Sequence, residues 1–239
     1  MTDRKVALIT GGSAGIGLAC GEALVGRGYD VVLTARGADR LHAAAAEIGA
    51  RGIVGDAAEP TDMAAVVDQL DRVDLLVHSA GVLLGTFVRK ETVEDFDAVI
   101  RANLRSAYVT THAVLAKMGV GGRLIFMSSS SSLEPMKARS AYSASKAGLN
   151  AFAKAISREV SRDGINVNLV IPAPVETDML EDVTFEMVAL QVKDVVDAVM
   201  FLDALDPRVV VPEIAMHANF EGPLAPPRLQ PDAFKRRRT

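Results

Sequence analysis

The chain has 239 residues, of which 49% are apolar and 23% charged, and its formal net charge is -4. This length and composition suit one α/β domain with a large core. The weak negative charge argues against nucleic acid or an anionic membrane as a partner, because both would repel the protein. The single cysteine, Cys20, excludes an intramolecular disulfide and fits a reducing compartment.

Short apolar runs alternate with segments of helical periodicity along the chain. The runs predict strands at residues 6–9, 31–33, 53–54, 75–77, 124–127, 167–171 and 209–211. Between them, helices are predicted at about residues 15–27, 39–48, 61–70, 92–117, 143–161 and 193–205. This alternation predicts a single-domain Rossmann-type α/β fold, doubly wound, with a mainly parallel sheet of about seven strands and helices on both faces. Residues 1–220 are expected to form the domain and residues 221–239 an irregular tail, with the basic run 235–238 solvated.

A glycine-rich turn joins the first predicted strand to the first helix. Its sequence is Thr10-Gly11-Gly12-Ser13-Ala14-Gly15-Ile16-Gly17. Glycines permit a tight turn and let a pyrophosphate approach the backbone, and the helix N-terminus then offers unpaired N–H groups to the phosphates. The segment therefore predicts a dinucleotide-binding turn.

The same segment also matches the G-x-S-x-G elbow of serine hydrolases, with Ser13 as the nucleophile. An elbow on the first strand leaves no earlier strand to supply the second oxyanion donor. The dinucleotide interpretation is therefore favoured, and the hydrolase stays an alternative.

The glycine spacing, G-x-x-x-G-x-G, resembles the cofactor turn of the short-chain dehydrogenase/reductase family, and the resemblance runs from about residue 5 to about 215. It implies a nicotinamide cofactor held by the turn through Gly11, Ser13, Gly15, Ile16 and Gly17. Rossmann domains that bind NAD carry an acidic residue after the second strand, whereas an arginine accepts the 2′-phosphate of NADP. Here the strand ends in Ala35-Arg36, so Arg36 predicts NADP(H). Ala14 stands where NADP-preferring members often carry a second basic residue.

Two further segments match cofactor-contacting positions of the family. Asp56, after the third strand, resembles an adenine-contacting aspartate, with a helix N-cap as the alternative role. In His78-Ser79-Ala80-Gly81, where the family usually has Asn-Asn-Ala-Gly, Ala80 and Gly81 are expected beside the cofactor ribose. His78 is expected to form structural hydrogen bonds between strands rather than to act in catalysis.

Tyr142 and Lys146 stand four residues apart, one turn apart on one face of a predicted helix. Ser129 precedes Tyr142 by the separation that the family shows between its catalytic serine and tyrosine, with Ser128 and Ser130 as neighbouring alternatives. The resemblance implies that Tyr142 is the acid–base and Lys146 lowers its pKa and holds the nicotinamide ribose. It also implies that Ser129 binds the substrate oxygen and that Asn103 holds a water for proton supply. A free phenol, with a pKa near ~10, needs such tuning to act at neutral pH.

The segment after the sixth strand is expected to contact the nicotinamide through Pro172, Val175 and Thr177. Ala173 replaces the glycine of the family pattern, which an alanine with a negative φ allows. Residues 179–187, with several apolar side chains, are expected to form a lid that suits an apolar substrate, although these side chains could equally pack on the core. Residues 209–216 lack the family's common Thr-Gly and Asp-Gly-Gly ending.

Together these observations predict an NADP(H)-dependent oxidoreductase that transfers a hydride between the cofactor and a small, apolar carbonyl or alcohol substrate. A non-catalytic NADP(H)-binding regulator is the second alternative beside the hydrolase. No metal, nucleic acid or membrane partner is expected, and the resemblance implies a homodimer or homotetramer. No apolar stretch reaches the ~18 residues of a spanning helix and no signal-peptide pattern is present, so a cytoplasmic location is expected.

Overall fold

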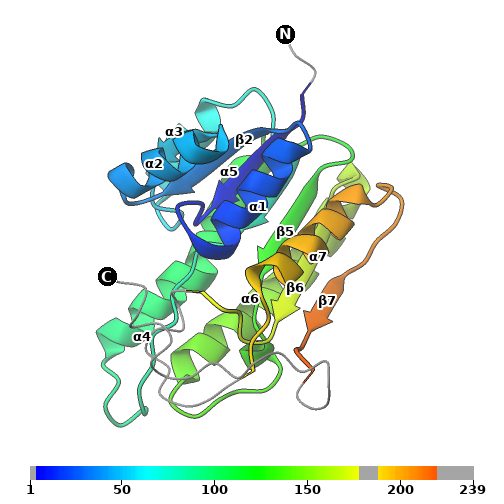
Figure 1. Cartoon of the computed structure of the whole chain (residues 1–239). Coiled ribbons are helices and arrows are strands. Elements are labelled where there is room, and N and C mark those ends of the chain that lie inside the picture. Colours follow the sequence, from blue (N-terminus) through cyan, green and yellow to red (C-terminus); the bar gives the residue numbers. More distant parts are fainter. Residues whose placement is uncertain (1–3, 178–187, 220–239) are drawn as a thin grey trace.

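The computed structural model describes residues 4–177 and 188–219. Within these residues seven parallel strands form one sheet in the order β3-β2-β1-β4-β5-β6-β7. The order reverses between β1 and β4, which creates a crevice at the carboxyl ends of these strands, where ligands of such folds bind. The predicted Rossmann-type fold is confirmed (Figure 1). The strands are β1 (Val6–Thr10), β2 (Asp30–Ala35), β3 (Arg51–Val54), β4 (Leu75–His78), β5 (Arg123–Met127), β6 (Asn166–Pro172) and β7 (Glu213–Met216).

Helices cover both faces of the sheet. Helices α1 (Gly15–Gly26), α2 (Ala38–Ile48) and α7 (Val192–Ala204) pack on one face. The other face carries α3 (Pro60–Asp68), α5 (Ser106–Leu115) and α6 (Ser140–Val160). The remaining elements are α4 (Val93–Ile100), the π-helical turn η1 (Arg101–Arg105) and the 3-10 turns η2 (Ser130–Ser132) and η3 (Ser161–Asp163).

The strands supply side chains to both helical layers because successive residues of a strand point to opposite faces. In β5, Leu124 and Phe126 join the core under α3, α5 and α6, whereas Ile125 and Met127 join the core under α1, α2 and α7. All four are buried. The continuous apolar strands of the sequence therefore reflect burial on both faces.

The last predicted strand is shifted in the structure. The three valines at 209–211 favour an extended backbone, but they lie outside the sheet, and β7 begins at Glu213. Register with β6 decides the difference, since Leu169 pairs with Glu213 and the Asn168 side chain donates to the carbonyl of Val211 at 2.6 Å. The prediction of a strand at 209–211 was therefore wrong, and the strand begins four residues later, at Glu213.

The helix predicted over residues 92–117 is interrupted. Thr92 caps α4 by accepting a hydrogen bond from the Asp95 N–H at 3.1 Å. The helix then passes through the π-helical turn η1 before α5 begins. Such turns insert a residue into an α-helix and occur often at functional sites. The apolar periodicity of the sequence does not reveal this insertion.

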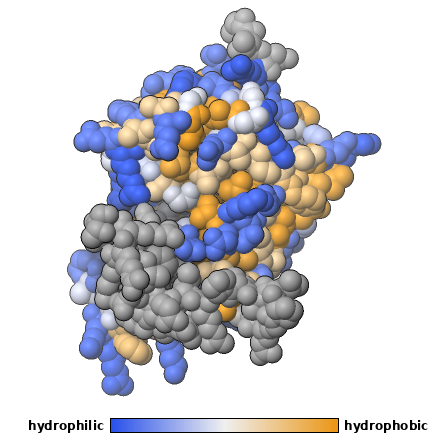
Figure 2. Space-filling view, viewed as in Figure 1, coloured by the Kyte–Doolittle hydropathy of each residue, from blue (hydrophilic) through white to orange (hydrophobic). Residues whose placement is uncertain are grey.

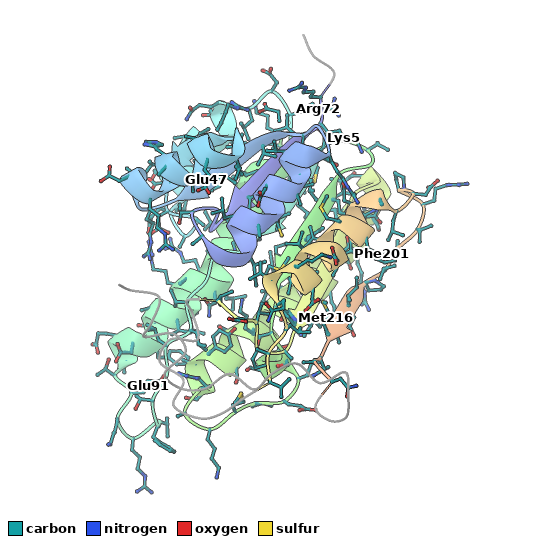
Figure 3. The ribbon with its side chains drawn as sticks, in the orientation of Figure 1. Lys5, Glu47, Arg72, Glu91, Phe201 and Met216 are labelled. Carbon is teal, nitrogen blue, oxygen red and sulfur yellow. The ribbon has the colours of Figure 1, made fainter. Side chains whose placement is uncertain are left out.

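Helices α1 and α7 lie side by side in front of the sheet (Figure 1). The space-filling view from the same side shows apolar residues gathered over this region among polar ones (Figure 2). Phe201, on α7, is 52% exposed there (Figure 3). None of the described helices is long and apolar enough to cross a membrane.

Candidate active site

A cleft of about 890 Å³ opens at the carboxyl ends of β1, β2, β4, β5 and β6. This volume lies in the range of small-molecule and cofactor sites. Most of the residues expected at the site line it, namely Gly11, Ser13, Gly15, Ile16, Arg36, Asp56, Ala80, Gly81, Ser129, Tyr142, Lys146, Pro172, Val175 and Thr177. Gly17 and Asn103 do not line the cleft and lie behind its wall.

The turn after β1 has a backbone that only glycine fits. Gly11 and Gly15 have φ angles of +67° and +55°, in the left-handed region. A Cβ on Gly17 would lie 2.4 Å from the Gly11 carbonyl oxygen, so Gly17 keeps the turn tight although it does not face the cleft. Helix α1 begins without a side-chain cap, which leaves its first N–H groups available to an anion. The turn therefore fits a dinucleotide pyrophosphate.

The structure gives no support to Ser13 as a hydrolase nucleophile. A serine nucleophile needs a histidine base within hydrogen-bond reach. All four histidines belong to the described residues, and Ser13 forms no hydrogen bond with any of them. The buried His78 is bonded to Thr10 and Ser106 instead.

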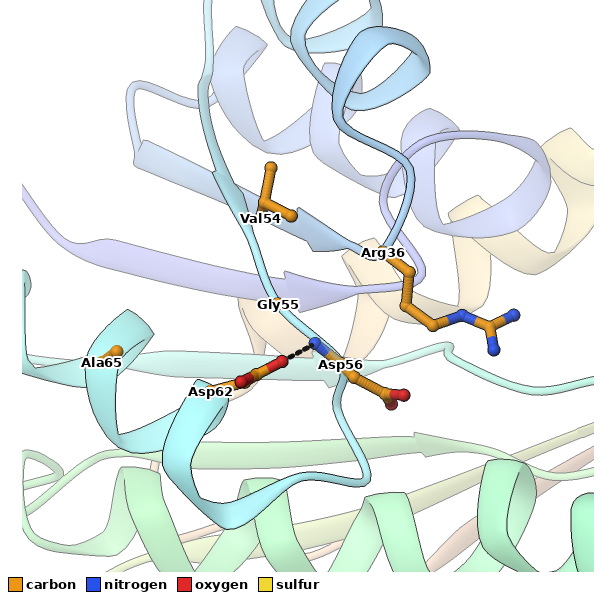
Figure 4. A pocket seen from close by; sticks show the side chains of 6 residues that line it. All are labelled: Arg36, Val54, Gly55, Asp56, Asp62 and Ala65. Carbon is orange, nitrogen blue, oxygen red and sulfur yellow. Dashed lines mark hydrogen bonds between the residues drawn. The ribbon is translucent and has the colours of Figure 1, made fainter.

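Arg36 lies at the far end of the cleft, directly after β2. It is exposed and lines a side cavity of about 390 Å³ together with Asp56, in which both side chains extend from the strand ends (Figure 4). The carboxylate of Asp56 accepts hydrogen bonds from the Ala58 N–H at 2.9 Å and from Arg101 at 2.9 Å. Burial raises the pKa of Asp56, but these hydrogen bonds and the charge of Arg101 outweigh it and hold the pKa below its usual value. Asp56 is thus an ionised group with local structural bonds.

Tyr142, Lys146 and Ser129 meet at the other end of the cleft. Tyr142 and Lys146 lie one turn apart on α6, and the Lys146 ammonium is 5.8 Å from the centre of the Tyr142 ring. The Ser129 side chain acts on the Tyr142 phenol and lowers its pKa. The neighbouring Ser128 instead donates to Asn150 at 2.5 Å. Ser129 is thus the residue of the serine run that acts on the phenol.

Burial dominates the ionisation of this cluster. It raises the pKa of Tyr142, and the hydrogen bond with Ser129 and the charge of Arg139 oppose this rise only in part. It lowers the pKa of Lys146 to about 8. The Lys146 ammonium donates to the Met127 carbonyl at 2.8 Å, toward the sheet. Ser129 and Arg139 are the groups that lower the pKa of Tyr142 here, and the tuning of Tyr142 by Lys146 that the resemblance implies stays a prediction.

Asn103 lies in the π-helical turn η1 and is fully buried. Its amide oxygen accepts from the Val82 N–H at 2.7 Å, and its amide nitrogen donates to the Val82 carbonyl and to Ser145, both at 3.0 Å. A side-chain amide has two N–H donors, and both are engaged here. The side chain fixes the loop after β4 to α6, which leaves only its second oxygen lone pair for the water that the resemblance implied.

His78 is bonded on both sides of its ring, as expected for a structural role. Ser106 donates its hydroxyl to the Ala102 carbonyl at 2.6 Å, so it accepts from His78 Nε2 at 3.1 Å. His78 Nδ1 then accepts from the Thr10 hydroxyl at 3.0 Å, and Thr10 in turn accepts from the Ala80 N–H at 3.2 Å. Burial, with a smaller effect of the Lys146 charge, lowers the pKa of His78 to about 3. The imidazole is therefore neutral.

The segment after β6 forms the wall opposite the glycine turn. A Cβ on Gly15 would lie 3.8 Å from the methyl group of Thr177. Val175 forms an isolated bridge with Leu190, and Thr177 donates to the Val175 carbonyl at 3.3 Å. Among the described non-glycine residues only Ala138 has a positive φ, so Ala173 takes the negative φ that it requires. The lid expected at 179–187 and the tail at 221–239 lie outside the described residues.

Three arginines that line the cleft, Arg40, Arg101 and Arg139, were not predicted from the sequence. Arg101 holds Asp56 and Glu59 at 2.9 and 2.6 Å, and Arg139 stands beside the phenol. No local pattern marks Arg101, because its partners Asp56 and Glu59 are distant in the chain. The position of Arg139 three residues before Tyr142 was the one signal that could have found it.

The fold and the site together define a Rossmann-type dinucleotide-binding protein. The family model of short chain dehydrogenases matches residues 5–187, and the chain belongs to this family of oxidoreductases. It is 34% identical over 183 residues to 3-oxoacyl-[acyl-carrier-protein] reductase of Escherichia coli. This match covers 73% of this chain and 75% of the reductase. It is 30% identical over 221 residues to an uncharacterized oxidoreductase of Staphylococcus epidermidis, covering 89% and 96% of the two chains. A solved short chain dehydrogenase of Burkholderia cenocepacia in complex with NADP is similar with a TM-score of 0.80 and 30% identity, covering 89% and 96%.

Proposed function

We propose that this protein is an NADP(H)-dependent oxidoreductase that interconverts a carbonyl compound and its alcohol. The observation that carries the proposal is the cluster of Tyr142, Ser129 and Lys146 at one end of the cleft that begins at the glycine turn. Such a cluster provides a proton donor, a second hydrogen bond to the same oxygen and a buried cation.

The residues of the cleft fit a nicotinamide dinucleotide. The turn of Gly11 to Gly17 would hold the pyrophosphate, and Asp56 the adenine end. Ala80, Gly81 and Lys146 would hold the nicotinamide ribose, and Pro172, Val175 and Thr177 the nicotinamide. Arg36 would bind the 2′-phosphate of NADP through its planar guanidinium. The complex of the Burkholderia relative with NADP supports this choice.

The chain's own groups would handle the proton of the reaction. When bound, the reduced cofactor supplies a hydride to the carbonyl carbon. Tyr142 then donates its hydroxyl proton to the carbonyl oxygen, so that its O–H bond breaks as the O–H bond of the alcohol forms. Ser129 donates a second hydrogen bond to this oxygen and stabilises its growing negative charge. The raised pKa of Tyr142 keeps the phenol protonated at neutral pH, as the reductive direction requires.

The walls near Tyr142 support a substrate with an apolar part. Val82 and Leu83 pack against the cluster of Val99, Ala141 and Tyr142 and also line the cleft. Exposed apolar side chains on α4 and α5, including Phe96 and Tyr108, fit a homo-oligomer that covers these helices. The negative net charge supports the proposal that neither nucleic acid nor a membrane is a partner, and a cytoplasmic location stays part of the proposal.

The cofactor proposal is tested by fluorescence titration with NADPH and NADH. The chain has no tryptophan, so the emission of the nicotinamide itself reports binding. We expect NADPH to bind more tightly than NADH. Arg36→Ala should weaken NADPH binding by about 10- to 100-fold, the range of a charge-assisted hydrogen bond, with a much smaller effect on NADH.

The matched control is Arg162→Ala, which removes an exposed arginine of η3. It should leave the preference for NADPH intact. Tighter binding of NADH by the unmodified protein would refute the role of Arg36. Binding of neither nucleotide would refute the oxidoreductase proposal.

A further inference from the structure

Arg139 joins the two loops that form the walls of the cleft near Tyr142. It is half-buried, precedes α6 and lines the cleft. Its Nη1 donates to the Gly85 carbonyl at 3.4 Å. A Cβ on Gly85 would lie 2.3 Å from the Ala138 carbonyl oxygen and 2.9 Å from Nη1 of Arg139, so this approach needs the glycine. Ala138, with a φ of 58°, bends the backbone just before the arginine.

The guanidinium has donors to spare. It carries five N–H groups, and the weak bond with Gly85 uses one of them. The other N–H groups have no partner among residues 4–177 and 188–219. The carboxylate of Glu91 (Figure 3) accepts from the hydroxyl of Ser140, the residue after Arg139, at 3.0 Å and forms no ion pair with Arg139. A partly exposed guanidinium with free N–H donors in a cleft can bind an anionic ligand.

No carboxylate among the described lining residues balances the positive charge at this end of the cleft. Lys137 also lines it, whereas Asp56, the carboxylate that lines the described part of the cleft, belongs to the other end and is paired with Arg101. The loop with Asp56 follows β3, and Arg36 follows β2, which is three strand spacings from β5, or about 14 Å. A phosphate bound at Arg36 therefore belongs to the other end of the cleft.

The charge of Arg139 acts at the reacting end, since it lowers the pKa of Tyr142. Around it the wall is apolar, formed by Val82, Leu83 and Met136. Apolar walls with one unpaired guanidinium suit a molecule that has a hydrocarbon part and one anion. A carboxylate matches the planar fork of an arginine in two parallel hydrogen bonds.

Building on the proposed function, we propose that the substrate is an apolar carbonyl compound that also carries a carboxylate, and that Arg139 binds this carboxylate. The arginine is then a specificity-determining residue of the substrate site. The bound anion also cancels the field that Arg139 exerts on the phenol, which favours the protonated Tyr142 that donates its proton to the carbonyl oxygen.

The test compares 2-, 3- and 4-formylbenzoate with their methyl esters as substrates, with NADPH as the reductant. Each pair has the same ring and aldehyde and differs in one negative charge, and the three isomers vary the distance between the carboxylate and the carbonyl. We expect a higher kcat/KM for the acid than for the ester in at least one pair. Arg139→Gln should reduce this acid-to-ester ratio by about 10- to 100-fold.

Arg158→Gln is the matched control. It removes an exposed arginine of α6, 19 residues after Arg139, or about 28 Å along the helix axis. The ratio should not change in this variant, and thermal denaturation should show that both variants are folded. An ester that is reduced as well as its acid in all three pairs would overturn the inference, as would an equal loss on acid and ester in Arg139→Gln.

Calorimetric titration with benzoate separates this inference from the proposed function. Benzoate carries the carboxylate but no reducible group, and it is titrated into the protein with and without NADPH. Binding that weakens by about tenfold or more in Arg139→Gln supports the inference even when none of the aldehydes is reduced, a result that would count against the proposed reaction alone. Benzoate binding that is absent, or equal in Arg139→Gln, contradicts the inference while leaving activity on neutral aldehydes as evidence for the reductase.

Discussion

His78 should make the protein less stable in mild acid. Burial holds the pKa of its imidazole at about 3, whereas the pKa in the unfolded chain is about 6.5. Between these values the unfolded chain binds a proton that the folded chain does not, so the free energy of unfolding falls as the pH falls below about 6.5. From these two pKa values, the free energy of unfolding at pH 5 is lower by about 2 kcal/mol than at pH 8.

The measurement is urea denaturation at several pH values between 5 and 8. His78→Asn should cost stability at pH 8, because a shorter side chain does not span Thr10 and Ser106 as the imidazole does. The free energy of unfolding of the variant should lack the pH dependence that His78 causes. The amount by which the unmodified protein is more stable than the variant should therefore be about 2 kcal/mol smaller at pH 5 than at pH 8. His217→Asn, at an exposed histidine, is the control and should follow the unmodified protein. Parallel stability curves for His78→Asn and the unmodified protein would refute the assignment of a neutral buried imidazole.

Two variants in the cluster at the reacting end separate catalysis from stability. Tyr142→Phe should lower kcat by about 10²- to 10⁴-fold, the usual contribution of an acid–base group, and keep NADPH affinity; Tyr108→Phe, at an exposed tyrosine of α5, should lower neither. Substantial turnover by Tyr142→Phe, measured as carbonyl-dependent oxidation of NADPH, would exclude Tyr142 as the proton donor. Lys146→Met should abolish turnover but raise the free energy of unfolding by about 1–2 kcal/mol at pH 7. The lowered pKa of about 8 means that burying the charged Lys146 costs the folded state about 3 kcal/mol. The variant removes this cost but also loses the hydrogen bond to Met127, which offsets part of the gain. In the unfolded chain Lys146 keeps its proton to higher pH, so the cost of its burial falls as the pH rises from 8 to 10.5. Urea denaturation should therefore show that the higher free energy of unfolding of Lys146→Met disappears over this range. A variant that is less stable than the unmodified protein at pH 7 would contradict the reasoning.

The fold could be predicted from the sequence because almost every strand and helix has a recognisable local pattern of apolar residues. Strands buried on both faces appear as apolar runs, and the intervening helices show their own period. The signal failed at the edge strand. The side chains of β7 alternate between half-buried and exposed, so the valines before it were the more apolar segment. Pairing with β6 overrides that preference, and pairing partners are not visible in a local pattern.

The site was predictable where the chain itself brings residues together. Tyr142 and Lys146 share a helix face, and the glycine turn follows its strand directly, so spacing alone places them. The ionisation of the cluster was not predictable in this way. It depends on burial and on Arg139, whose side chain reaches Gly85 across 54 positions of sequence. A family resemblance identifies only the residues that match the family's motif, and it does not identify neighbours such as Arg139.

The π-helical turn η1 explains how one short segment serves both ends of the cleft. Arg101, at its start, holds Asp56 on the side of Arg36, whereas Asn103, two residues later, holds Val82 on the side of Tyr142. Its Ala102 carbonyl ends the chain of hydrogen bonds that runs from Ala80 through His78. The loop after β4 is thereby fixed at both of its sides by neighbouring residues of one turn. The inserted residue costs the helix regular hydrogen bonds, and the contacts to Asp56 and Val82 offset this cost at the place where the cleft needs a rigid wall.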